Sequence, residues 1–366
     1  MNPFEFHLPT KIVFGPGRVG GLEKELSPGW KRILVVTDKA AGQASGALDA
    51  ISLLKGRDLR VFDEVGENPS FGCLEAGKRA ALEHGADLVI GAGGGSPMDA
   101  AKGIAVLATN SGDMRDYMKG RALENDPLPV VCLPTTSGTG SEVTPYAVFT
   151  DLESRNKGGF AHPKIFPRLA LVDPRLTYSM PERLAVNTGL DVLTHALESY
   201  LSTTATPLTD TLALHAVRTV LDRLAAAARK EKEAMDCLAY ASMIAGVVIA
   251  HAGTILLHIA AYPLTVFHGV PHGLANALLL PAFLEFMRRR SSVQDRVTEL
   301  DAAFEAAGGL VEFITSLGVR MGLSKYGVEE SEFGLFAAKT IVKGDIGITP
   351  APVTEEEIRT IYRAAF

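Results

Sequence analysis

Cysteine is scarce in this chain, and positive charge is not in excess. The 366 residues contain three cysteines whose wide spacing fits neither a metal-binding pair nor a redox pair: Cys73, Cys132 and Cys237. An odd number of scattered cysteines also argues against a disulfide framework. The formal net charge is −6 with both signs dispersed along the chain, so a basic stripe for a phosphate backbone is missing. Nucleic acid is therefore not expected as a partner.

Export and membrane insertion are not indicated either. The first residues, MNPFEFHLPTK, lack the basic start and following apolar run of a secretory signal. One long stretch, 241–267, contains no Asp, Glu, Lys or Arg and is long enough to cross a bilayer. His251, His258 and Pro263 interrupt it and no second span accompanies it, which favours a pair of buried helices. We expect a cytoplasmic protein without a membrane partner.

The order of apolar segments predicts two domains. Short, continuous β-rich runs separated by helical segments occupy 32–38, 60–65, 86–95, 129–136 and 169–174. This pattern predicts a parallel sheet with crossover helices. Beyond Met180 the strand signal disappears and long Ala- and Leu-rich segments follow. The predicted fold is an α/β domain with a Rossmann-like parallel sheet over 1–180, followed by an all-α domain over 181–366.

A glycine-rich loop, GAGGGSPMDAAK at 91–102, follows one of the predicted strands and opens a predicted helix. Ser96 is expected to cap that helix, and Asp99 to occupy the capping-box position. The glycines would expose backbone N–H groups and the positive end of the helix dipole to a phosphate. Because Ser96 stands where G-x-G-x-x-G requires its third glycine, the loop alone predicts either an anion site or a tight turn without ligand.

A second loop, LPTTSGTGSEVT at 133–144, is rich in hydroxyl groups and follows the next predicted strand. Two such loops at the carboxyl ends of parallel strands would line one crevice, where ligands bind in open α/β sheets. Asp38 ends an earlier strand and could accept hydrogen bonds from a ribose, which would favour NAD(H) over NADP(H). Asp38 could equally be a turn former.

The helical half carries a candidate metal site. Asp191 and His195 are four residues apart in NTGLDVLTHALESY, so they project from one face of a helix. They could bind a metal together or hydrogen-bond to each other. Three further histidines lie within 256–277: His258, His268 and His272. Imidazoles with a carboxylate suit Fe²⁺ or Zn²⁺, although each histidine taken singly could be a buried core residue or a helix cap.

Taken together and in this order, the segments resemble the iron-containing, or group III, alcohol dehydrogenases. The resemblance extends from PTKIVFGPG at 9–17 through GGGSPMDAAK, PTTSGTGSEVT and TGLDVLTHALESY to VPHGLANALLLP at 270–281, about three quarters of the chain. It implies a dehydroquinate synthase-like architecture, with cofactor and metal between an α/β domain and a helical domain. The family's four metal ligands correspond to Asp191, His195, His258 and His272.

The resemblance also implies a nicotinamide cofactor and its contacts. Asp38 would bind the ribose and Asn68 would lie near the adenosine phosphates, whereas Lys157 would lie near the nicotinamide ribose. The pyrophosphate contacts would be Gly94, Gly95 and Ser96, and the threonines lining the pocket would be Thr135, Thr136, Thr139 and Thr144. NAD(H) is favoured over NADP(H), Fe²⁺ is the expected metal with Zn²⁺ as the second candidate, and a homodimer is expected.

One position departs from the family pattern. Many members have His-x-x-x-His-Pro where this chain reads HIAAYP, so Tyr262 replaces a second histidine near the nicotinamide. A phenol titrates near 10 when unperturbed, about 3.5 units above an imidazole, which alters the usual proton path. We consider Tyr262 and His268 as the candidate catalytic groups, with His268 supplying the missing imidazole.

The resulting prediction is a metal-dependent, NAD(P)-linked alcohol dehydrogenase or aldehyde reductase for small primary alcohols or aldehydes. A lyase or cyclase of the dehydroquinate synthase kind is the first alternative, but its phosphorylated substrates call for Lys and Arg, which are absent from 187–200 and 256–280. A metal-free maleylacetate-type reductase would not need the four ligands. A non-catalytic nucleotide-binding protein is the third alternative, because Tyr262 departs from the family pattern.

Overall fold

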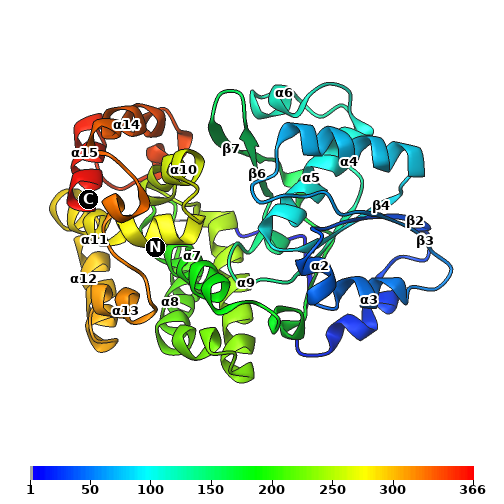
Figure 1. Cartoon of the computed structure of the whole chain (residues 1–366), viewed down its shortest axis with the longest axis horizontal. Helices are drawn as coiled ribbons and strands as arrows, with labels where there is room; N and C mark the ends of the chain where they lie inside the picture. The colour runs from blue at the N-terminus through cyan, green and yellow to red at the C-terminus, as the bar shows by residue number, and fades with distance from the viewer. Residues whose placement is uncertain (1–2) are drawn as a thin grey trace. The chain divides into compact units, whose positions relative to one another are not determined.

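The computed structural model describes residues 3–366, and within them everything except the side chain of Ala41. The chain forms two compact units (Figure 1). One unit comprises His7–Pro181, and the other comprises Glu182–Phe366 together with the residues up to Phe6. In the second unit the Phe6 ring stacks on that of His251, with ring centroids 3.9 Å apart. Residues 3–6 therefore group with the helical unit and not with the sheet.

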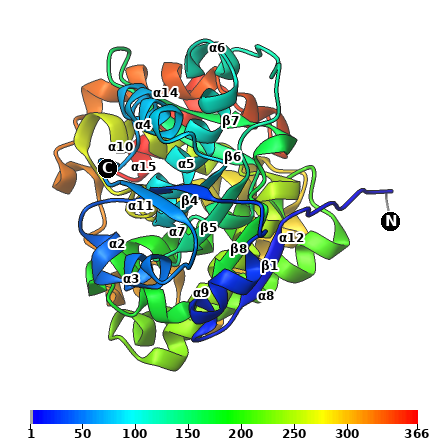
Figure 2. The ribbon, with the colours of Figure 1, turned by 90° about the vertical axis from the view of Figure 1, so that its right-hand side faces the viewer.

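The His7–Pro181 unit contains a six-stranded parallel sheet in the order β1-β8-β5-β4-β2-β3. Its strands are β1 (Lys11–Phe14), β2 (Arg32–Val36), β3 (Asp58–Phe62), β4 (Leu88–Gly93), β5 (Val130–Pro134) and β8 (Leu169–Val172). Strands β4, β5, β8 and β1 follow one another across the sheet in Figure 2. The five predicted strands and the parallel arrangement are confirmed. The edge strand β1 and the antiparallel hairpin of β6 (Tyr146–Asp151) and β7 (Asn156–Ala161) were not predicted.

Helices cover both faces of this sheet. On one face, α4 (Phe71–His84) and α5 (Gly95–Thr109) enclose a core with the sheet, and α2 (Ala41–Ala44) and α3 (Ala47–Ser52) lie on the other (Figure 1). Two short helices complete the unit, α1 (Leu22–Glu25) and α6 (Met114–Met118). Because both faces are covered, the strands β2, β4, β5 and β8 are buried almost throughout. This burial explains their continuous apolar runs.

The second unit is built from helices, and the structure describes no strand beyond β8. Its helices are α7 (Glu182–Leu201), α8 (Pro207–Ala228), α9 (Lys232–Ala252), α10 (Leu256–His268), α11 (His272–Arg290), α12 (Gln294–Ala306), α13 (Leu310–Ser316), α14 (Phe333–Ile341) and α15 (Glu355–Ala364). Within the unit, α7 packs against α8, α9 and α11, so its apolar face is enclosed. The predicted all-α second half is confirmed.

The charge-free stretch 241–267 forms the end of α9 and most of α10, separated at Gly253. By length and composition α9 could cross a membrane, but 72% of its apolar 18-residue segment is buried inside the protein. Burial to this extent is what the core helix of a soluble protein shows. The interpretation of this stretch as two buried helices is confirmed.

Candidate metal centre and nucleotide loops

The glycine-rich loop connects β4 to α5 as predicted, but its capping differs from the prediction. Helix α5 begins at Gly95 and its N-cap is Gly94, so Ser96 does not cap it. The Ser96 hydroxyl instead accepts a hydrogen bond from the Asn68 backbone N–H at 3.1 Å. The Asp99 carboxylate is likewise no capping-box group, because it accepts hydrogen bonds from the 133–148 segment. The side chains of Ser96 and Asp99, which the sequence predicted to cap the helix, therefore make tertiary contacts instead.

The two predicted loops lie side by side because β4 and β5 are neighbours in the sheet. A Cβ added to Gly94 would lie 3.2 Å from Oγ1 of Thr136, and one added to Gly95 would lie 2.6 Å from Cγ2 of Thr139. Glycine is required at Gly95, because a side chain there would displace the neighbouring loop. The backbone N–H groups at the start of α5 thus lie beside the hydroxyl-rich loop, as expected for an anion-binding crevice.

A buried lysine that the sequence did not single out fixes the second loop. Lys102 of α5 is fully buried, and its Nζ donates to the Ser141 carbonyl at 2.7 Å, the Ser141 hydroxyl at 2.8 Å and the Tyr146 carbonyl at 2.6 Å. It also lies 3.3 Å from Oγ1 of Thr144, one of the candidate pocket residues. Burial lowers the pKa of Lys102, and the nearby Asp99 opposes that effect. The Thr144 hydroxyl therefore faces the loop's own interior.

The other candidate cofactor residues are distributed over the same unit. Lys157 donates to Oδ1 of Asn68 at 2.8 Å, so Lys157, Asn68 and Ser96 form one connected set. Asn68 has φ +56°, a left-handed conformation that is uncommon outside glycine and best tolerated by Asn and Asp. Asp38 follows β2, and its carboxylate accepts the Ala40 N–H at 3.0 Å, as a turn former does. Thr135 follows β5 directly and is buried.

In the helical unit, the predicted metal-binding side chains converge. Asp191 and His195 lie one turn apart on α7, and His258 lies near the start of α10. All three are buried, and each presents a ligand atom within 4.8 Å of the others. Nε2 of His258 lies 3.6 Å from Oδ1 of Asp191, and the His195 and His258 rings stack with centroids 4.5 Å apart.

His272 joins this cluster from the first residue of α11. Its Nε2 lies 3.9 Å from Oδ1 of Asp191, and its ring centroid lies 5.1 Å from that of His258. The next residue, Gly273, lets α11 approach α7 closely, because a Cβ there would lie 1.9 Å from the Asn187 carbonyl oxygen. His272 therefore lies beside the cluster of Asp191, His195 and His258, so the structure brings the four residues named by the resemblance into one region.

The charges of this cluster fit a divalent cation. Burial alone would raise the pKa of Asp191, but His195, His272 and His258 hold it well below its usual range. Burial alone would lower the pKa of His258, whereas Glu198 and Asp191 raise it to about 9. A buried carboxylate with three converging imidazoles is a ligand set suited to Fe²⁺ or Zn²⁺, which would take the place of the histidine protons.

Two buried residues beside the ligands were missed by the sequence analysis. Glu198 of α7 hydrogen-bonds to Nδ1 of His258. Asn276 of α11 places its amide nitrogen 3.1 Å from Oδ1 of Asp191 and 3.2 Å from Nε2 of His258. Both could have been found from helical spacing: Glu198 is three residues after His195, and Asn276 is four residues after His272.

The two candidate catalytic residues have different surroundings. The Tyr262 ring lies 5.5 Å from that of His272, centroid to centroid, one turn beyond His258 on α10. His268 lies ten residues beyond His258, about 15 Å along the helix axis, and its Nε2 contacts Oε2 of Glu332 at 2.9 Å. The structure therefore does not bring His268 to the cluster, because the helix carries it away. That His268 supplies the missing imidazole stays a prediction.

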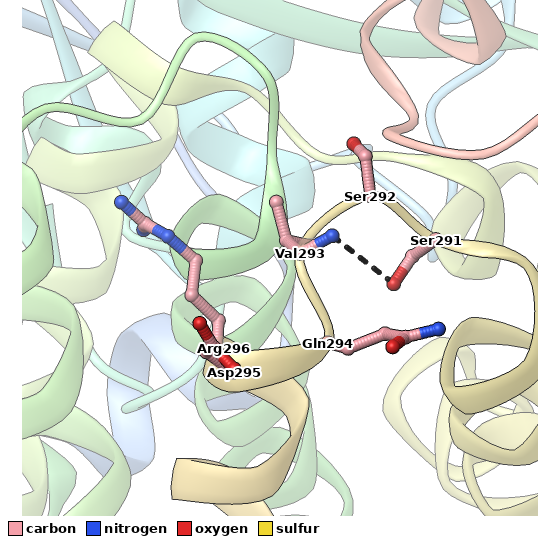
Figure 3. A pocket seen from close by; sticks show the side chains of 6 residues that line it. All are labelled: Ser291, Ser292, Val293, Gln294, Asp295 and Arg296. Atoms are coloured by element: carbon pink, nitrogen blue, oxygen red, sulfur yellow. Dashed lines mark hydrogen bonds between the residues drawn. The ribbon is translucent and has the colours of Figure 1, made fainter.

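A separate cavity of about 490 Å³ occurs at the start of α12 (Figure 3). Its lining is Ser291, Ser292, Val293, Gln294, Asp295 and Arg296. The Val293 N–H donates to the Ser291 hydroxyl at 3.4 Å, and Arg296 is paired with Asp210 at 2.6 Å. None of the candidate site residues lines this cavity, so it is not part of the metal cluster.

A parallel sheet with a glycine loop at a strand end, and a buried cluster of one carboxylate and imidazoles, are features typical of nucleotide- and metal-dependent enzymes. The chain matches the family model for iron-containing alcohol dehydrogenases over residues 9–174, and the model for the C-terminal region of the Fe-containing alcohol dehydrogenase family over residues 185–366. It therefore belongs to the iron-containing alcohol dehydrogenase family. The expected family, its architecture and an oxidoreductase activity on alcohols or aldehydes are confirmed.

Individual relatives cover the whole chain. A 1,3-propanediol dehydrogenase of Klebsiella pneumoniae is 32% identical over 99% of both chains. The crystal structure of an iron-containing alcohol dehydrogenase from Thermotoga maritima has a TM-score of 0.90 and 37% identity, covering 99% of both chains. A sulfoacetaldehyde reductase from Bifidobacterium kashiwanohense, solved in complex with NAD⁺, has a TM-score of 0.91 and 29% identity, covering 100% of this chain and 99% of its own.

Proposed function

We propose that this enzyme interconverts small primary alcohols and their aldehydes, using NAD(H) and one divalent metal ion, Fe²⁺ in preference to Zn²⁺. The observation that supports this most directly is the convergence of Asp191, His195 and His258 within 4.8 Å, with His272 beside them. A ligand set with a single carboxylate leaves a bound divalent cation with net positive charge. That charge supplies the Lewis acidity that favours the deprotonated alcohol and polarises an aldehyde.

The ligand residues have distinct tasks in this proposal. Asp191 supplies the negative charge, and the three histidines supply neutral nitrogen donors from three different helices. Burial of Asp191, His195 and His258 excludes water from the reacting atoms and strengthens their electrostatic effect on the substrate. Tyr262, whose ring lies beside His272, is the group we assign to proton transfer with the substrate oxygen.

We assign nicotinamide binding to the loops at the ends of β4 and β5. Backbone N–H groups at Gly95 and Ser96 would bind the pyrophosphate at the start of α5, and Thr136 and Thr139 line the same crevice. NAD⁺ held by these loops would supply the hydride acceptor for oxidation of the alcohol. The Asp38 carboxylate would repel a 2′-phosphate, which favours NAD(H) over NADP(H).

We further propose that the enzyme works as a homodimer in the cytoplasm. All three cysteines are free thiols in the structure, which supports a reducing compartment. Light scattering on the purified protein measures the oligomeric state, and a monomeric mass at working concentrations would contradict the dimer.

The test is metal-dependent turnover. Apoprotein prepared with a chelator is loaded anaerobically with Fe²⁺ or Zn²⁺, and NADH absorbance is followed with a panel of primary alcohols and, in reverse, aldehydes. We expect turnover only when metal is present. In His272→Ala we expect both turnover and metal retention to be lost. The control His215→Ala, which changes an exposed histidine on α8, should turn over normally. Metal-independent turnover, or full metal retention in His272→Ala, would refute the proposed site.

A further inference from the structure

We propose that Glu198 is a positioning residue that fixes the ring of His258 with its Nε2 lone pair directed at the metal. This inference rests on the proposed metal site. Asp191, His195 and Glu198 lie at positions i, i+4 and i+7 of α7, so they share one face of the helix. The first two are candidate ligands, whereas Glu198 acts on a ligand carried by another helix.

The contacts of Glu198 place both of its oxygens on the start of α10. Its side chain is fully buried. Oε1 accepts the backbone N–H of Ile255 at 2.9 Å and that of His258 at 3.2 Å, and Oε2 contacts Nδ1 of His258. Glu198 thus satisfies two N–H groups at the N-terminus of α10 and holds the His258 ring with its second oxygen.

Chemistry then decides which ring nitrogen is available. Oε2 of Glu198 contacts Nδ1 of His258, and a carboxylate oxygen accepts from a ring N–H, so this contact favours a proton on Nδ1 and leaves Nε2 as the ring nitrogen available to a metal. The opposite ring nitrogen lies on the side of the candidate ligands: Nε2 is 3.6 Å from Oδ1 of Asp191 and 3.2 Å from the amide nitrogen of Asn276. Carboxylate–imidazole pairs of this kind orient metal-binding histidines and raise their basicity.

A purely structural role makes a different prediction. Glutamine is nearly isosteric with glutamate, and its carbonyl oxygen could still accept from Ile255 and His258 at the helix start. Its amide nitrogen, however, would donate towards Nδ1 and favour the tautomer that protonates Nε2. Glu198→Gln therefore keeps the helix cap but opposes metal binding. If Glu198 only caps α10, the same variant binds metal normally.

The experiment compares metal affinity in matched variants. Wild type, Glu198→Gln and the control Glu332→Gln are prepared as full-length apoproteins, and Zn²⁺ affinity is measured by competition with a chromophoric chelator. Glu332 contacts His268 at 2.9 Å, so the control removes a carboxylate–imidazole pair outside the metal cluster. We expect affinity to fall about 10- to 100-fold in Glu198→Gln and to stay unchanged in Glu332→Gln. Equal affinity in all three proteins would overturn the proposal.

A spectroscopic measurement keeps the proposal testable if Glu198→Gln does not fold. In Zn²⁺-loaded wild type with ¹⁵N-labelled histidine, His258 should show a slowly exchanging Nδ1–H proton and a metal-bound Nε2. The signal is assigned by its absence in His258→Gln. Binding through Nδ1, or a fast-exchanging Nδ1 proton, would overturn the role of Glu198. If wild type does not bind Zn²⁺, the proposed metal-dependent function itself is refuted. That outcome differs from the ones that refute only the role of Glu198.

Discussion

The Cα of Gly273 faces the carbonyl oxygen of Asn187 so closely that a Cβ would lie 1.9 Å from that oxygen. The same Cβ would lie 2.9 Å from Cβ of Asp191. Because Gly273 follows His272 directly, the close approach of α11 to α7 is what carries the fourth candidate ligand to Asp191. A glycine beside a histidine thus links helix packing to the geometry of the metal site.

Gly273→Ala is expected to separate the two helices and weaken metal binding. The neighbouring atom is backbone and cannot rotate away, so we expect a loss of about 1–3 kcal/mol in the free energy of unfolding. Metal affinity should fall on the order of tenfold because His272 moves from Asp191. Thermal unfolding and chelator competition measure the two effects. The control is Gly334→Ala in α14, where an added Cβ would lie 3.9 Å from the nearest atom. Equal losses of stability and metal affinity in the two variants would contradict the packing argument.

Gly95→Ala is expected to weaken NADH binding. A Cβ at this position would lie 2.6 Å from Cγ2 of Thr139, so the hydroxyl-rich loop must move away from the start of α5. We expect the Kd for NADH, measured by fluorescence titration, to rise roughly tenfold, about 1.4 kcal/mol, with metal affinity unchanged. Gly72→Ala, at the start of α4 with its nearest atom 3.8 Å away, serves as the matched control. Unchanged NADH affinity in Gly95→Ala would refute the assignment of NADH binding to the glycine loop.

Glu142→Gln is expected to stabilise the protein at alkaline pH. Burial raises the pKa of Glu142 from 4.5 to about 7, against the opposing effects of a backbone hydrogen bond and of Lys102. The folded state therefore binds this proton more tightly than the unfolded chain, and stability is lost as pH rises from about 4.5 to about 7. Glutamine cannot ionise, so its advantage should grow over that window to at most about 3.4 kcal/mol.

Thermal unfolding midpoints at pH 5 and pH 8 measure this difference. The control is Glu153→Gln, whose side chain is 88% exposed, and it should shift the midpoint little at either pH. If the unfolding midpoint of Glu142→Gln equals that of wild type at both pH 5 and pH 8, the buried carboxyl is not destabilising when ionised.

Tyr262→Phe is expected to lower kcat while leaving metal and NADH affinity intact. The substitution removes only the hydroxyl from a ring 5.5 Å from that of His272. Loss of a proton-transfer group typically reduces turnover by about 10²-fold or more. Tyr262→His should introduce a limb near pH 6.5 in the pH profile of kcat. Tyr240→Phe, at a 40% exposed position on α9, is the control; undiminished kcat in Tyr262→Phe would exclude the phenol from the proton path.

Sequence patterns predicted the buried strands and the helical second half because continuous apolar runs and their spacing are local properties. The i, i+4 spacing of Asp191 and His195 likewise indicates a shared helix face, since helical periodicity alone fixes that relationship. Local rules failed where a side chain had a better distant partner. Ser96 and Asp99 have the right types for a helix cap, yet Asn68, Ser141 and Val148 use them instead.

By itself, the sequence determined the class of fold, the glycine loop and the types of residue available for a metal. Residue type and spacing left open which histidines meet, and the family resemblance named His258 and His272. The tertiary structure shows both beside Asp191, whereas His268, on the same helix as His258, contacts Glu332. It also revealed Lys102, Glu198 and Asn276, whose partners come from other segments of the chain. The physical reason is that a buried charged or amide group needs hydrogen-bond partners from the elements that pack around it. The local spacing of residues does not predict which elements those are.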